Sequence, residues 1–250
     1  MLATTLSILR QNPAIYLLLL VVYLTVHWLV EQGYIPEWSW YLTVILNLLL
    51  AFLVHRAVLF KQRFAVIDLA KRSVLLKAGE FASKSIGISI LSLGMIFLSM
   101  FAAFAISGFA LPGNIVLIVW FFIALATLPV PLAFVGTWLP ASVYGQASSF
   151  GEAIRRGRST FFPLLGKLLA SFALNFAITG LVSFAFVFYT RRTVPTMSGS
   201  GLFDLIGSTA IAIENIAQLM LISMGAVALS LTYVKAEGLN APPDGSRNEV

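Results

Sequence analysis

Long uncharged runs of apolar residues dominate the pattern of this chain. About 20 consecutive apolar residues are enough for a helix to cross the hydrocarbon core of a bilayer. Runs of this length and almost without charge cover residues 12–31, 38–57 and 167–189. A further run at 205–234 is interrupted only by Glu214. These four runs predict four membrane-spanning helices.

The uncharged stretch from 85 to 151 is long enough for two more spans. Glycine and proline around 108–114 are typical of a turn, which divides the stretch into spans at 86–108 and 114–137. The second of these carries Pro129 and Pro131 and is followed by Pro140, and each proline deletes a backbone hydrogen bond. Broken helices often line transporter sites, but the excess length of this segment favours a bend along the inner interface.

The composition excludes a soluble globular domain. Hydrophobic residues make up 59% of the chain and charged residues 10%, with a mean hydropathy of +0.94, whereas about 25% charge is usual. The chain has no cysteine, which excludes disulfides and thiolate metal sites. The sequence therefore predicts an all-α, polytopic transmembrane helix bundle of about six spans in one domain, residues 1–234.

The distribution of lysine and arginine predicts the orientation. Cytoplasmic loops retain positive charge, and with six spans every basic residue except Arg191 and Arg192 falls on one side. Both termini are then cytoplasmic, as are the connections 58–84 and 146–166 and a disordered tail at 235–250. We expect a cell inner membrane of bacterial type. Topology also explains the pI of about 9.8, so the charge predicts no nucleic-acid partner.

The connection 58–84 repeats apolar residues at near-helical spacing against basic ones, which is typical of an amphipathic helix. Lys71, Arg72 and Lys77 are then candidates for contact with anionic lipid head groups at the cytoplasmic face. Alternatively, the connection extends the flanking helices and its charges only fix the topology. The sequence leaves both interpretations open.

The connection 146–166 contains a possible capping box, in which Ser149 and Glu152 satisfy free amides at a helix start. A short basic helix is expected there, ending near Pro163. It carries Arg155, Arg156 and Arg158, candidates for contact with anionic lipid or a protein partner.

The segment Phe-Gly-Glu-Ala-Ile-Arg-Arg-Gly-Arg-Ser at 150–159 resembles a hairpin of several bacterial six-helix membrane families. One of these is the membrane domain attached to some glycerophosphodiester phosphodiesterases. The resemblance covers about 139–188 and rests on an acidic residue followed by basic residues at a helix start. It implies a six-helix membrane fold and no activity, because the chain contains no phosphodiesterase domain.

Polar residues inside the spans are the candidates for an intramembrane site. Glu214 is the only carboxylate well within a predicted span, and Asn47 is expected at similar depth. Gln218 and Asn175 are further candidates, the latter on a polar face with Ser171, Thr179 and Ser183. These residues form either a proton or cation site or hydrogen bonds that fix helix packing.

No catalytic motif is found, and no cofactor or metal site is predicted. We therefore expect a non-catalytic accessory or membrane-organising protein, in contact with the bilayer and with a protein partner or further copies of itself. The alternative is a carrier or channel for a small solute or lipid with its site around Glu214.

Overall fold

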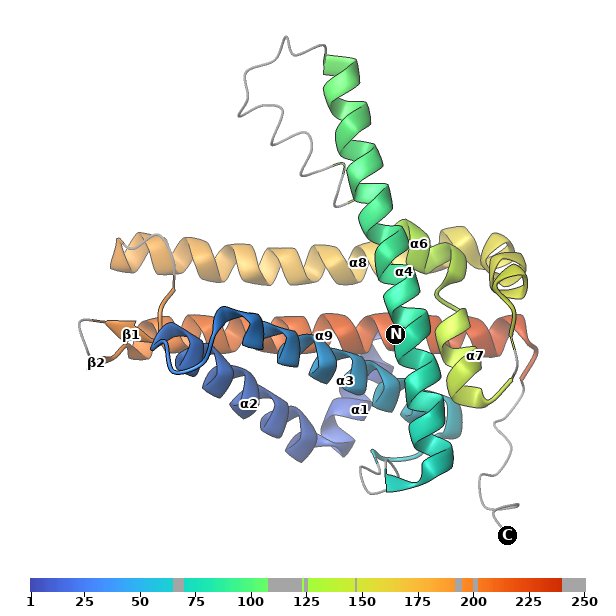
Figure 1. The fold of residues 1–250 in the computed structure, drawn as a ribbon, viewed down its shortest axis with the longest axis horizontal. Helices are drawn as coiled ribbons and strands as arrows, with labels where there is room; N and C mark the ends of the chain where they lie inside the picture. Colours follow the sequence, from blue (N-terminus) through green and yellow to red (C-terminus); the bar gives the residue numbers. More distant parts are fainter. Residues whose placement is uncertain are drawn as a thin grey trace. The chain divides into compact units, whose positions relative to one another are not determined.

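The computed structural model describes residues 1–64, 70–107, 123, 126–146, 148–191, 195–199 and 202–239. These residues are almost entirely helical (Figure 1). The elements are α1 (Leu2–Gln11), α2 (Pro13–Glu31), η1 (Glu37–Trp40), α3 (Tyr41–Phe60), α4 (Arg72–Ser107), α6 (Pro129–Val135), α7 (Trp138–Tyr144), α8 (Phe150–Thr190), β1 (Ser198–Gly199), β2 (Leu202–Phe203) and α9 (Leu205–Ala236).

Five helical segments among the described residues are long and apolar enough to cross a membrane: α2, η1 with α3, α4, α8 and α9. The predicted helical bundle of membrane type is thereby confirmed. The span predicted at 114–137 lies largely outside the described residues.

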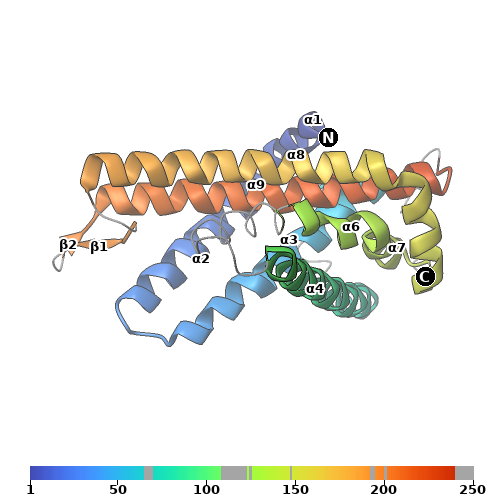
Figure 2. The same ribbon diagram turned by 90° about the horizontal axis from the view of Figure 1, so that it is seen from above.

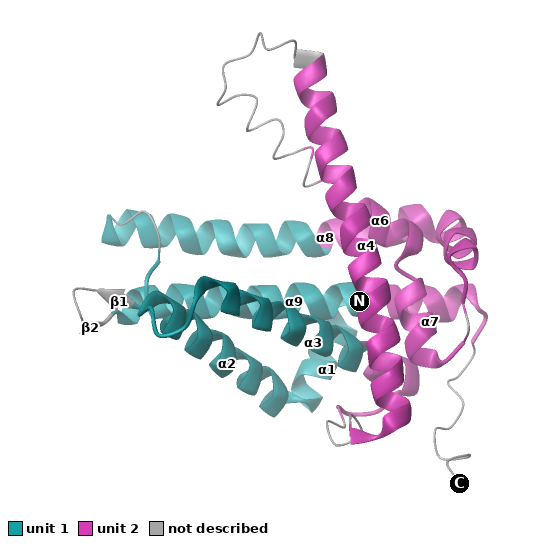
Figure 3. Cartoon of the chain, viewed as in Figure 1, with its two compact units in different colours: residues 1–54, 171–227 teal, residues 55–170, 228–250 magenta. Residues whose placement is uncertain are grey.

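The chain divides into two compact units (Figure 3). Unit 1 comprises Met1–Val54 and Ser171–Val227, and unit 2 comprises His55–Ala170 and Ala228–Val250. The helices α3, α8 and α9 contribute residues to both units.

The first predicted span is preceded by α1, a helix that the sequence analysis did not predict. Asn12 separates α1 from α2 with φ −132° and ψ 42°, outside the helical region. Pro13 explains the break, because a proline disfavours the helical conformation of the residue before it and fits the first position of a new helix. The side-chain amide of Asn12 donates to the Ile8 carbonyl at 2.8 Å and so satisfies a carbonyl at the end of α1.

The two longest helices extend well beyond what a bilayer requires. At 1.5 Å per residue, the 36 residues of α4 extend about 54 Å and the 41 residues of α8 about 62 Å, against a core of about 30 Å. The excess of α4 is its start, from Arg72 to Lys84, within the predicted connection 58–84. This part of the connection is therefore an extension of the span.

The helix expected to end near Pro163 does not end there. α8 is continuous from Phe150 to Thr190 with Pro163 inside it. A proline removes one amide donor, here the one that would reach the Ser159 carbonyl, and a long helix tolerates this loss by bending. Figure 2 shows the N-terminal portion of α8 turned away from the portion that follows it.

The bend expected at Pro129, Pro131 and Pro140 is instead a break. Two seven-residue helices, α6 and α7, are separated by a turn at Gly136 and Thr137, and both pack against α4 in unit 2. Gly136 lies so close to α9 that an added Cβ would be 2.5 Å from the Leu229 side chain. Close packing at a glycine therefore accompanies the break.

A two-residue antiparallel ladder, β1 with β2, precedes α9 in unit 1 and was not predicted. Asp204 follows the ladder and accepts the amides of Ile206 and Gly207 at 3.0 Å, capping α9. The Glu31 carboxylate at the end of α2 accepts the Met197 amide at 2.8 and 3.1 Å. The Asp204 amide also donates to the Met197 carbonyl at 2.8 Å, so these bonds together link the end of α2 to the start of α9.

Candidate functional site

Glu214 lies on α9 in unit 1, half-buried, and its carboxylate has a partner on another helix. Its Oε1 accepts the hydroxyl of Ser183, on α8, at 2.9 Å. The polar face of α8 that contains Ser183 therefore meets α9 at this level. Ser171, at the other end of that face, is buried at 1% exposure.

The other predicted members of the Glu214 site do not join it. Asn47 on α3 accepts the hydroxyl of Tyr23 on α2 through its Oδ1. Gln218 is exposed, and the Asn175 Oδ1 is buried without a hydrogen-bond partner. Among the described residues, no hydrogen bond links Glu214 to Asn47, Gln218 or Asn175.

His27 is the second ionisable group near Glu214. Its ring lies edge-on against Trp40, with 5.1 Å between the ring centres. The carboxylates of Glu31 and Glu214 both lie within electrostatic reach of its imidazole. Unit 1 thus contains one imidazole that two carboxylates can influence electrostatically.

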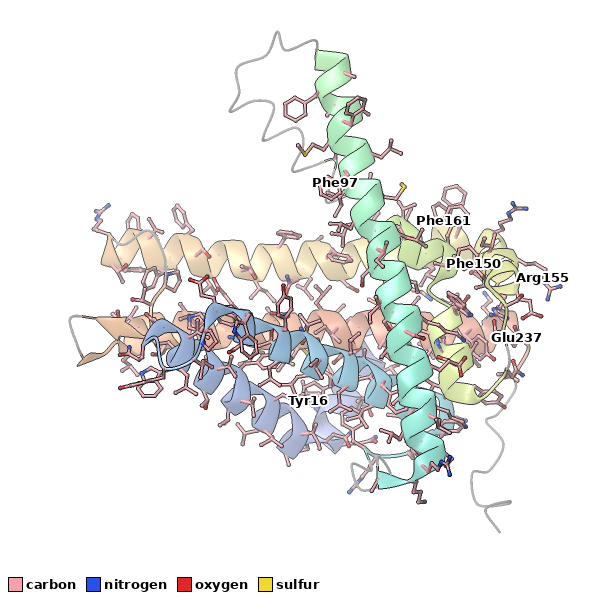
Figure 4. All side chains as sticks on the ribbon, viewed as in Figure 1. Tyr16, Phe97, Phe150, Arg155, Phe161 and Glu237 are labelled. Carbon is pink, nitrogen blue, oxygen red and sulfur yellow. The ribbon has the colours of Figure 1, made fainter. Side chains whose placement is uncertain are left out.

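Further hydrogen bonds within each unit join polar side chains of different helices. In unit 1 the Tyr16 hydroxyl, labelled in Figure 4, lies 2.7 Å from the Ser223 hydroxyl. In unit 2 the Nδ1 of His55 lies 2.6 Å from the hydroxyl of Ser230. His55 lies within α3, which continues to Phe60, and it is 1% exposed. A serine–histidine pair this deeply buried offers no surface to a substrate.

The predicted capping box at the start of α8 is confirmed. The Ser149 amide donates to the Glu152 carboxylate at 2.9 Å, and the Glu152 amide donates to the Ser149 hydroxyl at 3.2 Å. This reciprocal pair satisfies two amides at the helix start. It also fixes where the following arginines emerge from α8.

The three arginines of α8 have different environments. Arg155 and Arg158 are exposed, as expected of residues that contact lipid or a partner. Arg156 is 8% exposed and donates to Glu237 at 2.8 Å and to Ser148, and its guanidinium lies 5.4 Å from the centre of the Tyr233 ring. Arg156 is thus an internal residue of unit 2.

The basic residues of the connection 58–84 also have different environments. Lys71 and Arg72 are exposed at the start of α4. Lys77 turns toward the end of α7, where a Cβ built on Gly145 would lie 3.1 Å from the Lys77 ammonium. Gly145 has φ +87° and ends α7, so the cation lies near the C-terminal end of a helix, where the helix dipole favours positive charge.

A pocket of about 230 Å³ lies in unit 2 beside Arg156. Its lining consists of Gln146, Ser148, Glu152, Arg155, Arg156 and Glu237. Three of them, Gln146, Ser148 and Glu237, were not predicted from the sequence, and Glu237 was expected in a disordered tail. Instead, Glu237 belongs to the capped end of α9, where the amides of Glu237 and Leu239 donate to Tyr233 and Val234. The remainder of that tail, 240–250, lies outside the described residues.

The Arg156–Glu237 contact joins residues 81 positions apart, which explains why no local pattern indicated it.

Among the described residues, no group of three or more histidine, cysteine or acidic side chains could hold a metal ion. No protein-family model, curated protein or solved structure matches the chain.

Proposed function

We propose that this protein is a non-catalytic integral membrane protein that assists or organises a partner complex or the lipid around it. The hydrogen bond between Ser183 and Glu214 carries the proposal, because it uses the only carboxylate well inside a predicted span to join two helices. Hydrogen bonds of this kind contribute to helix packing and require no substrate. The bonds between Tyr23 and Asn47 and between Tyr16 and Ser223 have the same character.

The apolar surface of the long helices supports residence in lipid. Only 6% of the most apolar stretch of α4 and 11% of that of α8 are buried, against 61% for α9. Exposed residues of α4 include Ile90, Phe97 and Phe101. Acyl chains are suited to such surfaces. We place the chain in a bacterial inner membrane with about six spans and both termini in the cytoplasm.

Purification in mild detergent followed by mass spectrometry tests the proposal. A protein recovered at fixed stoichiometry, or a defined set of retained lipids, is the expected result. Solute flux through proteoliposomes that contain only this chain would contradict it.

A carrier or channel is the second candidate, favoured by one observation. The Asn175 Oδ1 is buried on the same face of α8 as Ser183 and accepts no hydrogen bond from any residue that the structure describes, so it is a candidate acceptor for a solute. On this hypothesis, Glu214→Gln abolishes proton-coupled flux while packing is kept, because glutamine retains an oxygen that accepts the Ser183 hydroxyl. Flux that is unchanged in Glu214→Gln would exclude a proton role for Glu214.

A further inference from the structure

The pocket beside Arg156 is formed entirely by residues of unit 2. It lies among the residues after α7, the first turns of α8 and the end of α9. Figure 4 labels Arg155 of α8 and Glu237 beyond α9, which belong to this end of the unit. Two arginines and two glutamates line it, so their formal charges cancel.

Arg156 has unused donors in this environment. Its two terminal nitrogens donate to Glu237 and Ser148, and because each of them carries two hydrogens, one hydrogen remains on each. The Nε–H finds no acceptor among the described residues, but it is too enclosed to meet a ligand in the pocket. The side chain is already held in place, so an acceptor would meet pre-oriented terminal nitrogens.

Two more donors line the same pocket. Arg155 is exposed and makes no hydrogen bond or ion pair within the described part of the chain. The side-chain oxygen of Gln146, Oε1, accepts the Tyr233 hydroxyl at 2.5 Å. The side-chain nitrogen of Gln146 therefore remains able to donate. Guanidinium and amide donors together are suited to a phosphate, because its oxygens accept several hydrogen bonds at once.

The two glutamates of the pocket provide hydrogen-bond acceptors with negative charge. Glu237 uses one oxygen for Arg156, and Glu152 uses one oxygen for the Ser149 amide. The second oxygen of each remains for another donor. A purely anionic ligand would meet as many negative as positive groups here, whereas a ligand with a phosphate and an ammonium a few atoms apart would match both.

We propose that this pocket binds a phosphoethanolamine group, with its phosphate on Arg155, Arg156 and Gln146 and its primary ammonium on Glu152 and Glu237. The group belongs either to the head of an aminophospholipid or to a soluble phosphoethanolamine ester. α8 exposes Phe150 at 41% and Phe162 at 81% on the same segment, as suits a helix portion at a lipid interface. The lipid source rests on the proposed function, whereas the pocket chemistry does not.

The test uses the full chain in detergent, with native mass spectrometry to measure retained lipid and calorimetry to measure binding of soluble glycerophosphoethanolamine. Phosphatidylethanolamine, phosphatidylglycerol and phosphatidylcholine are the lipid probes, because they share the phosphate and differ in the amine. We expect phosphatidylethanolamine to be retained at least fivefold more strongly than the other two. Arg155→Gln should weaken both the retention of phosphatidylethanolamine and the binding of the soluble ester, because it removes a phosphate donor from the pocket. Arg158→Gln, an exposed arginine of the same helix that does not line the pocket, should bind both as the parent chain does.

Equal retention of the three lipids together with no binding of the soluble ester would overturn the inference. Loss of binding in Arg158→Gln equal to that in Arg155→Gln would do the same. Binding of the soluble ester without lipid preference would support the pocket and assign its ligand to the soluble source. The proposed function fails separately, through solute flux, so the two failures are distinguishable.

Discussion

At the scale of single residues, a glycine permits a close approach of two helices in unit 2. Gly157 of α8 faces α6, and a Cβ at this position would lie 1.8 Å from the Phe134 carbonyl oxygen. Only a residue without a side chain permits this approach. Gly166, on the same helix, has nothing within 4 Å of such a Cβ and provides a matched control.

We predict that Gly157→Ala lowers the free energy of unfolding by roughly 1–3 kcal/mol, the usual cost of overpacking. Gly166→Ala should be neutral or stabilising by up to about 1 kcal/mol, since alanine favours helix more than glycine does. Reversible unfolding in mixed micelles of a mild detergent and SDS measures both. Equal stability of Gly157→Ala and the parent chain would contradict the contact between α6 and α8.

The hydrogen bond between Ser183 and Glu214 should contribute less to stability than the close packing at Gly157. Ser183→Ala should cost about 0.6 kcal/mol, the average for interhelical hydrogen bonds in membranes. Glu214→Gln should cost less, because an acceptor oxygen remains. A double-mutant cycle with Glu214→Ala and Ser183→Ala measures the coupling in the same unfolding assay. A coupling energy of zero would show that the bond contributes nothing to packing.

At the scale of elements, the start of α8 is fixed by local chemistry. We predict that Ser149→Ala, which removes half of the reciprocal cap, destabilises the first turn by about 0.5–2 kcal/mol. Ser159→Ala is the control, because the Ser159 hydroxyl donates only to the Arg156 carbonyl of its own helix. Amide hydrogen exchange should become faster at 150–153 in Ser149→Ala alone. Unchanged exchange there would mean that the cap does not hold the turn.

Features that depend on neighbouring residues could be predicted from the sequence, whereas features that depend on residues distant in the sequence could not. The capping box depends on residues three positions apart, so the sequence indicated it. Pro13 is an equally local signal for the start of α2, but the break before it and helix α1 were not predicted. The continuity of α8 through Pro163 depends on the whole helix, and the burial of Arg156 depends on Glu237. Asn47 and Glu214 were matched by depth alone, but depth does not specify which helices face each other. Tyr23 and Ser183 are their actual partners.

At the scale of the whole molecule, the number of crossings determines whether the termini share one side of the membrane. Five candidate spans lie in the described residues, and an odd total would place the termini on opposite sides, whereas a sixth crossing near 114–137 would place them together. The basic residues favour six, because only Arg191 and Arg192 would then face outward. The absence of cysteine makes a direct test possible, since any introduced thiol is the only one present.

We predict that Ala3→Cys and Ala236→Cys are both protected from a membrane-impermeant thiol reagent in intact bacterial cells and are labelled after permeabilisation. Both positions are exposed in the structure, so protection would come from the membrane and not from burial. Tyr34→Cys, in the exposed connection after α2, should be labelled in intact cells and serves as the outward control. Labelling of Ala236→Cys but not Ala3→Cys in intact cells would establish an odd number of crossings. The charge argument would then fail, because the basic N-terminal portion of α8 would no longer lie on the same side as both termini.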